Sequence, residues 1–488
     1  PRAHPTSPFF LAVLIGLLFA NTISPQPAAA RPSSPSTPIE IHSGELIAKI
    51  TTRADPKFSY ALYLPSGYSP EKTWPILFLF DARGRGTHAA ERFVPAAEKY
   101  GWILVSSNDS RSDEIVDPNI AAMQAMLADA RKRFAIDLKR LYAGGFSGGA
   151  RAACLMGLAF PDAVAGVIGA SGGFPLEQRP DQNLPFGFFG TVGDLDFNYY
   201  EMHILDRDLA DLGLRHRLAV FAGTHQWMPT ELATEAIEWM EIQAMRSARR
   251  TKDPSLAATI AKERANRARA LESTQPLDAR LAWEALVADF TEVVAADEPA
   301  LVEARERAKK FATDPAIAKA KRLRDQSVRR DLEQVHRAQQ ALAAVSPENA
   351  ASNLGRLLTF LRIRDLKNQA KSADHEQSLS AQRVLATYRV QTSFYLPREF
   401  MAQKDWARAE LCLEIATEIE SRDEEVWLHL AEVRAQSGSK KRALAALERA
   451  IEEGLQSREL IEANELLAPL RSEERFRELL AQLGAAAN

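Results

Sequence analysis

Short runs of β-branched and aromatic residues alternate with helical segments over the first half of the chain, and this alternation limits the fold more than any other feature. Several runs are continuously apolar, as strands covered by helices on both faces must be. The predicted strands are residues 58–65, 74–80, 102–107, 140–147, 164–171, 186–192 and 217–223. Helical segments such as 120–134 and 199–212 separate most of them. The alternation predicts an α/β domain over residues 39–245 with a doubly wound, mostly parallel sheet.

Beyond residue 245 the strand pattern ends, and apolar residues recur at helical spacing among Ala, Glu, Arg and Leu. We predict a helical region over 246–385 and helical repeats over 386–488. The repeat is visible in residues that recur 34 positions later, with Ala409, Leu413 and Ala416 matched by Ala443, Leu447 and Ala450. This period and these small residues are typical of tetratricopeptide (TPR)-like helix pairs. An Ala-rich helical bundle with a chance echo is the alternative.

The N-terminal segment has the pattern of an export signal. An apolar run, FFLAVLIGLLFA (residues 9–20), follows a weakly basic start and precedes a polar stretch that ends in three alanines. It predicts a signal peptide over residues 1–30, cleaved after Ala30, and so a secreted or periplasmic protein. Residues 31–38, RPSSPSTP, predict an extended Pro/Ser linker. The apolar run is too short to span a bilayer comfortably, so no stable membrane insertion is expected, and an uncleaved anchor is the less favoured alternative.

Composition and motifs argue against several classes of partner and cofactor. The formal net charge is −3 with 26% charged residues, which gives no electrostatic reason to expect nucleic acid. No phosphate-binding glycine loop, metal-ligand cluster or dinucleotide fingerprint occurs in its supporting context, so no cofactor and no metal are predicted. Cys154 and Cys412 lie among apolar residues of predicted helices in different domains. We expect them to be buried core residues rather than a disulfide.

One motif indicates a nucleophile. Residues 145–149 read Gly-Phe-Ser-Gly-Gly, a G-x-S-x-G pattern directly after the strand-like RLYAG and before an apolar helical segment. In that context the pattern is typical of a nucleophile elbow, a tight strand-to-helix turn that presents the serine Oγ above the sheet. The start of the following helix favours developing negative charge. We therefore predict Ser147 as the nucleophile, with a structural Gly-rich turn as the alternative.

A serine nucleophile needs a base, and in this fold the chain order is Ser, then acid, then His. His225 fits best, because it follows the last predicted strand, from which a loop residue can reach back over the sheet to Ser147. His203 and His216 are the alternatives. His203 lies inside a predicted helix, and His216 lies beside two arginines at a strand start, where exposure is the ordinary explanation.

The acid is expected just after the strand that precedes the base, where the sequence reads GTVGDLDFNYY. It offers Asp194 and Asp196. The spacing Gly-x-x-Asp that ends at Asp196 is the more familiar acid loop, so Asp196 is preferred. Asp194 is the alternative acid, or else it caps the following segment or hydrogen-bonds the loop.

The oxyanion hole is expected to use two backbone N–H groups. One belongs to Gly148, and the other to Ala82 or Arg83 in the loop after strand 74–80. Asp81 precedes them, and a carboxylate there would raise the energy of a nearby oxyanion unless an arginine pairs with it. We interpret Asp81 as a loop-shaping residue held by Arg83 and Arg85.

Residues 58–245 resemble the dienelactone hydrolase, polyhydroxybutyrate depolymerase and feruloyl esterase-like part of the α/β-hydrolase superfamily. The resemblance rests on YALYLPSGY, IDLKRLYAGGFSGGAR and FAGTHQW, and it covers about two fifths of the chain. It implies a Ser–Asp–His ester hydrolase with Ser147 as nucleophile, Asp196 as acid and His225 as base. Asp81 departs from the usual His-Gly of these families, and the helical tail departs from their single-domain members.

Together these features predict an exported serine hydrolase that cleaves carboxylic esters through an acyl-enzyme. Segment 172–185 leaves no room for a long helical cap, so we expect an open site suited to bulky or polymer-borne esters. A peptidase of the same superfamily is less favoured, because no propeller domain precedes the hydrolase segment. In a third interpretation the hydrolase domain is a scaffold, and the repeats bind a protein or peptide partner. An intact set of nucleophile, acid and base favours an active enzyme with a docking tail.

Overall fold

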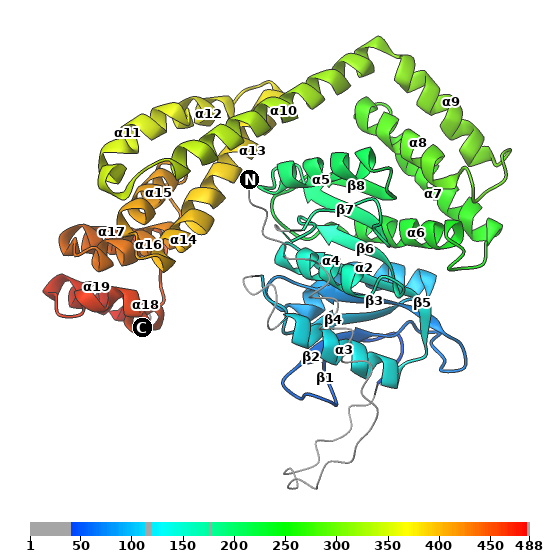
Figure 1. Ribbon diagram of the computed structural model, residues 1–488, viewed down its shortest axis with the longest axis horizontal. Helices are drawn as coiled ribbons and strands as arrows, with labels where there is room; N and C mark the ends of the chain where they lie inside the picture. Colours follow the sequence, from blue (N-terminus) through cyan, green and yellow to red (C-terminus); the bar gives the residue numbers. More distant parts are fainter. Residues whose placement is uncertain (1–40, 113–118, 176–177, 486–488) are drawn as a thin grey trace, which may run out of the picture. The chain divides into compact units, whose positions relative to one another are not determined.

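The structure is a computed structural model that describes residues 41–112, 119–175 and 178–485 (Figure 1). The predicted signal peptide and linker lie outside these residues. None of the helices within the described ranges has the length and apolar character needed to cross a membrane. By packing, the chain divides into two compact units, one ending at Lys321 and the other beginning at Arg322, except that Leu195–Phe197 group with the second.

The first unit is built on an eight-stranded sheet in the order β1-β2-β4-β3-β5-β6-β7-β8. β2 pairs antiparallel with both β1 and β4, and the other neighbours are parallel. The strands are β1 (Leu46–Thr51), β2 (Ser59–Tyr63), β3 (Trp74–Phe80), β4 (Ile103–Ser107), β5 (Ile136–Phe146), β6 (Val164–Ala170), β7 (Gly187–Gly193) and β8 (His216–Phe221). The predicted doubly wound, mostly parallel sheet is confirmed.

Helices cover both faces of this sheet, which explains why its central strands are continuously apolar. These helices are α2 (Gly86–Tyr100), α3 (Asn119–Arg133), α4 (Gly148–Ala159), α5 (Tyr199–Asp211) and α6 (Thr230–Arg246). α2 packs against α6, α3 packs against α4, and α5 lies against β7 and β8. Every residue of β3 and β7 is buried. The helices predicted at 120–134 and 199–212 are confirmed as α3 and α5.

All seven predicted strands are present as β2 to β8, but β1 is an eighth that the sequence pattern does not reveal. Its sequence LIAKIT contains exposed residues, and only Ile50 is fully buried. β1 lies at the edge of the sheet. An edge strand with little covering lacks the continuous apolar run that marks the central strands.

Three helices beyond the last strand belong to the same compact unit, namely α7 (Pro254–Leu271), α8 (Pro276–Phe290) and α9 (Pro299–Thr313). Each begins with proline, which lacks the N–H group that the start of a helix leaves unpaired. Their apolar faces share a core with Ile242 and Met245 of α6. The boundary predicted at residue 245 therefore marks the end of the α/β part, whereas the packing unit continues to Lys321.

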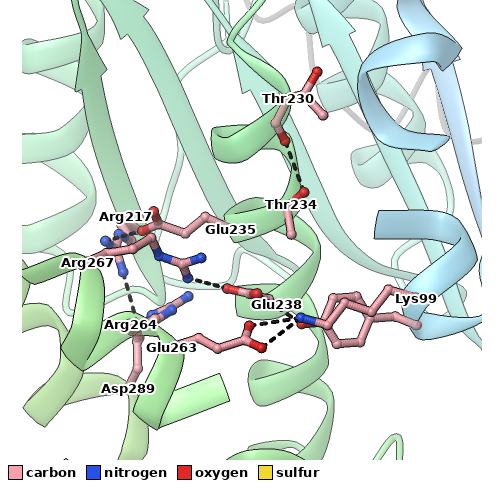
Figure 2. A network of polar contacts seen from close by, with 11 residues as sticks. Lys99, Arg217, Thr230, Thr234, Glu235, Glu238, Glu263, Arg264, Arg267 and Asp289 are labelled. Carbon is pink, nitrogen blue, oxygen red and sulfur yellow. Dashed lines mark hydrogen bonds and ion pairs between the residues drawn. The ribbon is translucent and has the colours of Figure 1, made fainter. Parts of the chain in front are cut away.

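A buried polar network joins α7 and α8 to α6 and β8 (Figure 2). Arg264 of α7 pairs with Asp289 of α8 at 2.6 Å, and Asp289 also accepts a hydrogen bond from the indole N–H of Trp239 at 3.0 Å. Arg217 of β8 pairs with Glu235 of α6 and lies 3.4 Å from Asp289. Buried charges are costly unless they are paired, so the stability of α7 and α8 depends on the α/β part. The stability of the α/β part depends on α7 and α8 for the same reason.

The second unit is helical, as predicted for the C-terminal part of the chain. Its helices are α10 (Pro315–Ala343, which crosses the division), η2 (Pro347–Asn349), α11 (Ala350–Phe360), α12 (Ile363–Gln369), α13 (His375–Val390), η3 (Gln391–Tyr395), α14 (Leu396–Ala402), α15 (Trp406–Ile419), α16 (Glu424–Gln436), α17 (Lys440–Glu453), α18 (Arg458–Ala463), η4 (Glu465–Leu470) and α19 (Glu474–Ala485). The predicted boundary at residue 385 falls within α13.

The 34-residue echo corresponds to two helices of this unit. Its matched alanines and leucines lie on α15 and α17, and all of them are buried in one apolar core. α16 packs against both helices. Small residues at these positions allow the helices to approach closely. The TPR-like character of the region stays a prediction, and it applies to helices α14 to α17.

Candidate active site

Ser147 is the single residue between the end of β5 and the start of α4. Its backbone has φ 55° and ψ −121°, a strained conformation for a residue with a side chain. The neighbouring glycines are needed there, because a Cβ at Gly145 would overlap the carbonyl of Gly149, and a Cβ at Gly149 would overlap the carbonyl of Phe80. This is the geometry of a nucleophile elbow, which presents a half-buried hydroxyl at the end of the sheet.

The structure brings His225 to this hydroxyl. His225 Nε2 lies 3.0 Å from Ser147 Oγ, although the two residues are 78 positions apart. The imidazole packs against the ring of Phe146, with the ring centres 4.7 Å apart. His216 is occupied elsewhere, since its Nδ1 lies 2.8 Å from the carbonyl oxygen of Leu214 and its Nε2 lies 3.4 Å from Asp206. His203, the third candidate, lies within α5.

Both candidate acids lie in the turn after β7. The carboxylate of Asp194 accepts a hydrogen bond from the backbone N–H of Gly223 at 2.9 Å, and its own N–H donates to the carbonyl of Phe221 at 2.8 Å. Asp194 thus fastens the turn to the end of β8, directly before the loop that carries His225. Asp196 is fully buried two residues further along.

Asp81 is fully buried at the end of β3 and is the centre of a hydrogen-bond cluster. Its carboxylate accepts from the backbone N–H groups of Arg83 (2.8 Å) and Arg85 (3.2 Å), from the guanidinium of Arg85 and from the indole N–H of Trp227 (2.7 Å). Burial alone would raise the pKa of Asp81, but these hydrogen bonds outweigh it and hold that pKa below its ordinary value. The predicted pairing with an arginine side chain is found with Arg85.

The cluster also engages one of the candidate oxyanion donors. The N–H of Arg83 is already donated to Asp81, so this candidate oxyanion donor is engaged elsewhere. The Ala82 carbonyl accepts from the Ser112 N–H at 2.9 Å. Gly148 is the first residue of α4, where backbone N–H groups have no acceptor within the helix. A Cβ on Gly148 would overlap Ser112, so a glycine is needed where these loops meet.

No protein-family model matches this chain, and no curated protein matches it either. Among solved structures, a thermostable esterase is 16% identical with a TM-score of 0.34, and the match covers 40% of this chain and 62% of the esterase. An S-formylglutathione hydrolase from Staphylococcus aureus is 14% identical with a TM-score of 0.34, covering 41% of this chain and 98% of that one. Dipeptidyl peptidase 4 of Porphyromonas gingivalis is 11% identical with a TM-score of 0.29, covering 40% and 35%.

The strand order together with the serine turn after β5 defines the architecture. The fold is that of an α/β-hydrolase. Within the ranges that the structure describes, no group of three or more His, Cys, Asp or Glu side chains is placed to hold a metal ion.

The sequence pattern does not reveal the contacts of three residues near the serine, namely Trp227, Ser110 and Ser112. The indole of Trp227 binds Asp81, the Ser110 hydroxyl donates to the Asp81 carbonyl at 2.7 Å, and Ser112 abuts Gly148. Trp227 lies only two residues after His225, and this proximity was the one available signal. The partners of Trp227 and Ser110 depend on how separate loops meet, which no local pattern records.

Proposed function

We propose that this protein is a serine hydrolase that cleaves carboxylic esters through an acyl-enzyme on Ser147. The 3.0 Å approach of His225 Nε2 to the Oγ of a strained elbow serine carries the proposal. His225 takes the hydroxyl proton while Oγ attacks the ester carbonyl, and then gives that proton to the leaving alcohol. Water, deprotonated by His225, attacks the acyl-enzyme and releases the carboxylic acid and the free serine.

We assign the acid of the triad to Asp196. The chain order of serine, acid and histidine supports either aspartate, but the Asp194 carboxylate is engaged by the Gly223 amide. In this proposal Asp194 shapes the loop that carries His225. Asp196 holds the imidazole in the tautomer that leaves Nε2 free to accept a proton.

We assign the oxyanion hole to the N–H groups of Gly148 and Ala82. Gly148 opens α4, where the aligned peptide dipoles favour negative charge. Arg83, the other candidate from the sequence, has its N–H bound to Asp81. Because Arg85 pairs with Asp81, the carboxylate is neutralised beside the developing oxyanion.

The substrate, the export of the protein and the role of the tail also belong to this proposal. The short connection between β6 and β7 supports an open site for bulky or polymer-borne esters. A docking role for the repeats fits their predicted TPR-like character, since such stacks offer extended surfaces to protein or peptide partners. The same elbow also serves peptidases, and a comparison of ester with peptide hydrolysis distinguishes the two activities.

The first test is labelling of the wild-type protein with a fluorophosphonate probe, which phosphonylates an activated serine and releases fluoride. We expect labelling to be lost in Ser147→Ala and His225→Gln and kept in His216→Gln, the matched histidine control. A panel of p-nitrophenyl esters and peptide p-nitroanilides then compares ester with peptide hydrolysis. A folded wild-type protein that does not label contradicts the proposal, and turnover of the anilides alone replaces the esterase with a peptidase.

A second comparison decides between the two acids. Asp196→Asn should lower kcat for a p-nitrophenyl ester by about 10³ to 10⁴-fold, since the imidazole then loses its orienting charge. Asp194→Asn keeps an oxygen that accepts from Gly223 and should retain most activity. The reverse ranking of the two variants would move the acid to Asp194.

A further inference from the structure

The second oxygen of the Asp81 carboxylate binds a group from another loop, in addition to the guanidinium of Arg85. Oδ2 of Asp81 accepts the indole N–H of Trp227 at 2.7 Å, across 146 positions of sequence. Both side chains are buried, with 0% of Asp81 and 4% of Trp227 exposed. This hydrogen bond joins the loop after β3 to the loop after β8, and Trp227 lies two residues after His225 in that second loop. A charge-assisted hydrogen bond in a buried place is both strong and directional.

The first oxygen orients the loop after β3. Oδ1 accepts from the backbone N–H groups of Arg83 and Arg85, which closes the turn around Ala82. The Asp81 carbonyl is held by the Gly84 N–H at 3.2 Å and by the Ser110 hydroxyl at 2.7 Å. In a trans peptide the N–H points opposite to the C=O, so fixing this carbonyl also fixes the direction of the Ala82 N–H.

The Trp227 ring reaches the nucleophile elbow as well. Its centre lies 5.7 Å from that of Phe146, the residue directly before Ser147, and 6.1 Å from that of Phe93 on α2. Phe146 in turn packs against the imidazole of His225. The Trp227 indole therefore contacts Phe146, directly before the nucleophile, and donates to the Asp81 carboxylate that shapes the loop after β3. Trp227 also follows His225 by two residues.

From these contacts we infer that Asp81 and Trp227 form a positioning pair. The pair holds the Ala82 N–H and the His225 imidazole in the orientation that the reaction at Ser147 requires. The inference rests on the proposed function, because the orientation of these two groups affects a rate only if Ser147 is acylated. Neither residue touches the reacting atoms in this account. The pair acts in the acylation and deacylation steps, where small displacements are costly, and contributes little to substrate binding.

The test compares Trp227→Phe with the matched variant Trp239→Phe. Both substitutions remove an indole N–H that donates to a buried aspartate, but the partner of Trp239 is Asp289, in the network of α6 to α8. For a p-nitrophenyl ester at a temperature well below both melting points, we expect kcat of Trp227→Phe to fall about 10 to 100-fold with KM nearly unchanged. Trp239→Phe should keep the wild-type kcat while losing stability.

Asp81→Asn is the second variant and should lower kcat further, because an amide offers one acceptor oxygen where the carboxylate offers two. If Asp81→Asn does not fold, Trp227→Phe alone decides. A wild-type kcat in Trp227→Phe, or a loss confined to KM, overturns the positioning role. Fluorophosphonate labelling of the wild type separates the two proposals: labelling with an unaffected Trp227→Phe overturns only this one, whereas no labelling of the wild type overturns both.

Discussion

Two buried aspartates in this protein bind the same kinds of side chain, an indole and a guanidinium, but join different parts of the first unit. Asp81 accepts from the indole of Trp227 at 2.7 Å and pairs with the guanidinium of Arg85 at 3.0 Å. Asp289 accepts from the indole of Trp239 at 3.0 Å and pairs with Arg264 at 2.6 Å. Each carboxylate is buried and accepts from an indole N–H that is distant in the sequence, 146 positions away for Asp81 and 50 for Asp289. The two clusters share an indole donor and a guanidinium partner, and they differ in the elements that surround them.

The difference lies in what each cluster joins. Asp289 connects α8 to α6 and α7, whose apolar faces are already packed together, and Arg217 of β8 lies close by (Figure 2). Asp81 connects two loops at the end of the sheet, one between β3 and α2 and the other between β8 and α6. A paired charge between packed helices adds stability, whereas the same pair between loops determines geometry. The comparison therefore predicts that damage to one cluster lowers stability, and damage to the other lowers the catalytic rate.

Removal of the Asp289 carboxylate should have the largest effect on stability. Asp289→Ala leaves Arg264, whose side chain is only 5% exposed, without its closest charge partner. Breaking a buried ion pair in this way costs about 3 to 5 kcal/mol, so we expect a fall of that size in the free energy of unfolding measured in urea. The folded fraction should hydrolyse a p-nitrophenyl ester at the wild-type kcat. A stability loss under about 1 kcal/mol would mean that Glu235 and Glu238 compensate for the missing carboxylate.

The indole substitution at the same cluster should have an intermediate effect. Trp239→Phe removes one N–H from Asp289 but leaves Arg264 in place. An acceptor that loses a donor in a buried place costs about 1 to 3 kcal/mol in the free energy of unfolding. The urea midpoint should fall without a change in kcat. A lower kcat in this variant would break the comparison, because it would connect the helical network to the active site.

Acid should weaken the Asp81 cluster. Since the folded-state pKa of Asp81 lies below its ordinary value of 3.8, its ionised form contributes stability that is fully present above that pH and is lost as the pH falls through the lower folded value. The stability difference between wild type and Asp81→Asn, measured by urea unfolding, should therefore be constant near neutral pH and shrink below about pH 4. Other carboxylates, such as Glu235, titrate in both proteins and cancel in the difference. A constant difference down to pH 3 would contradict this account.

An exposed ion pair beside the helical network should have the smallest effect. Glu292 pairs with Arg246 at 3.2 Å, but its side chain is 67% exposed. Glu292→Ala should change the free energy of unfolding by about 0 to 1 kcal/mol, because water and salt screen such a pair. The variant serves as the matched control for Asp289→Ala. A loss as large as that of Asp289→Ala would remove burial as the reason for the difference between the two pairs.

The sequence by itself determined the parts of this protein that depend on local patterns. Short β-rich runs, several of them continuously apolar, predicted β2 to β8. The G-x-S-x-G pattern between strand and helix predicted the turn at Ser147, and the position after the last strand singled out His225. A strand buried on both faces, a tight turn and an amphipathic helix each leave a signature within a few residues, because neighbouring side chains share one environment.

Only the tertiary structure decided which distant groups meet. No pattern along the chain connects Trp227 with Asp81 over 146 positions, or places Asp289 25 positions from Arg264 as its partner. The continuation of the first unit to Lys321 is of the same kind, because composition marks α7 to α9 as helices without saying that they share a core with α6. A hydrogen bond between loops, or a core shared by helices, depends on how finished elements pack, and packing is a property of the folded chain rather than of any segment of it.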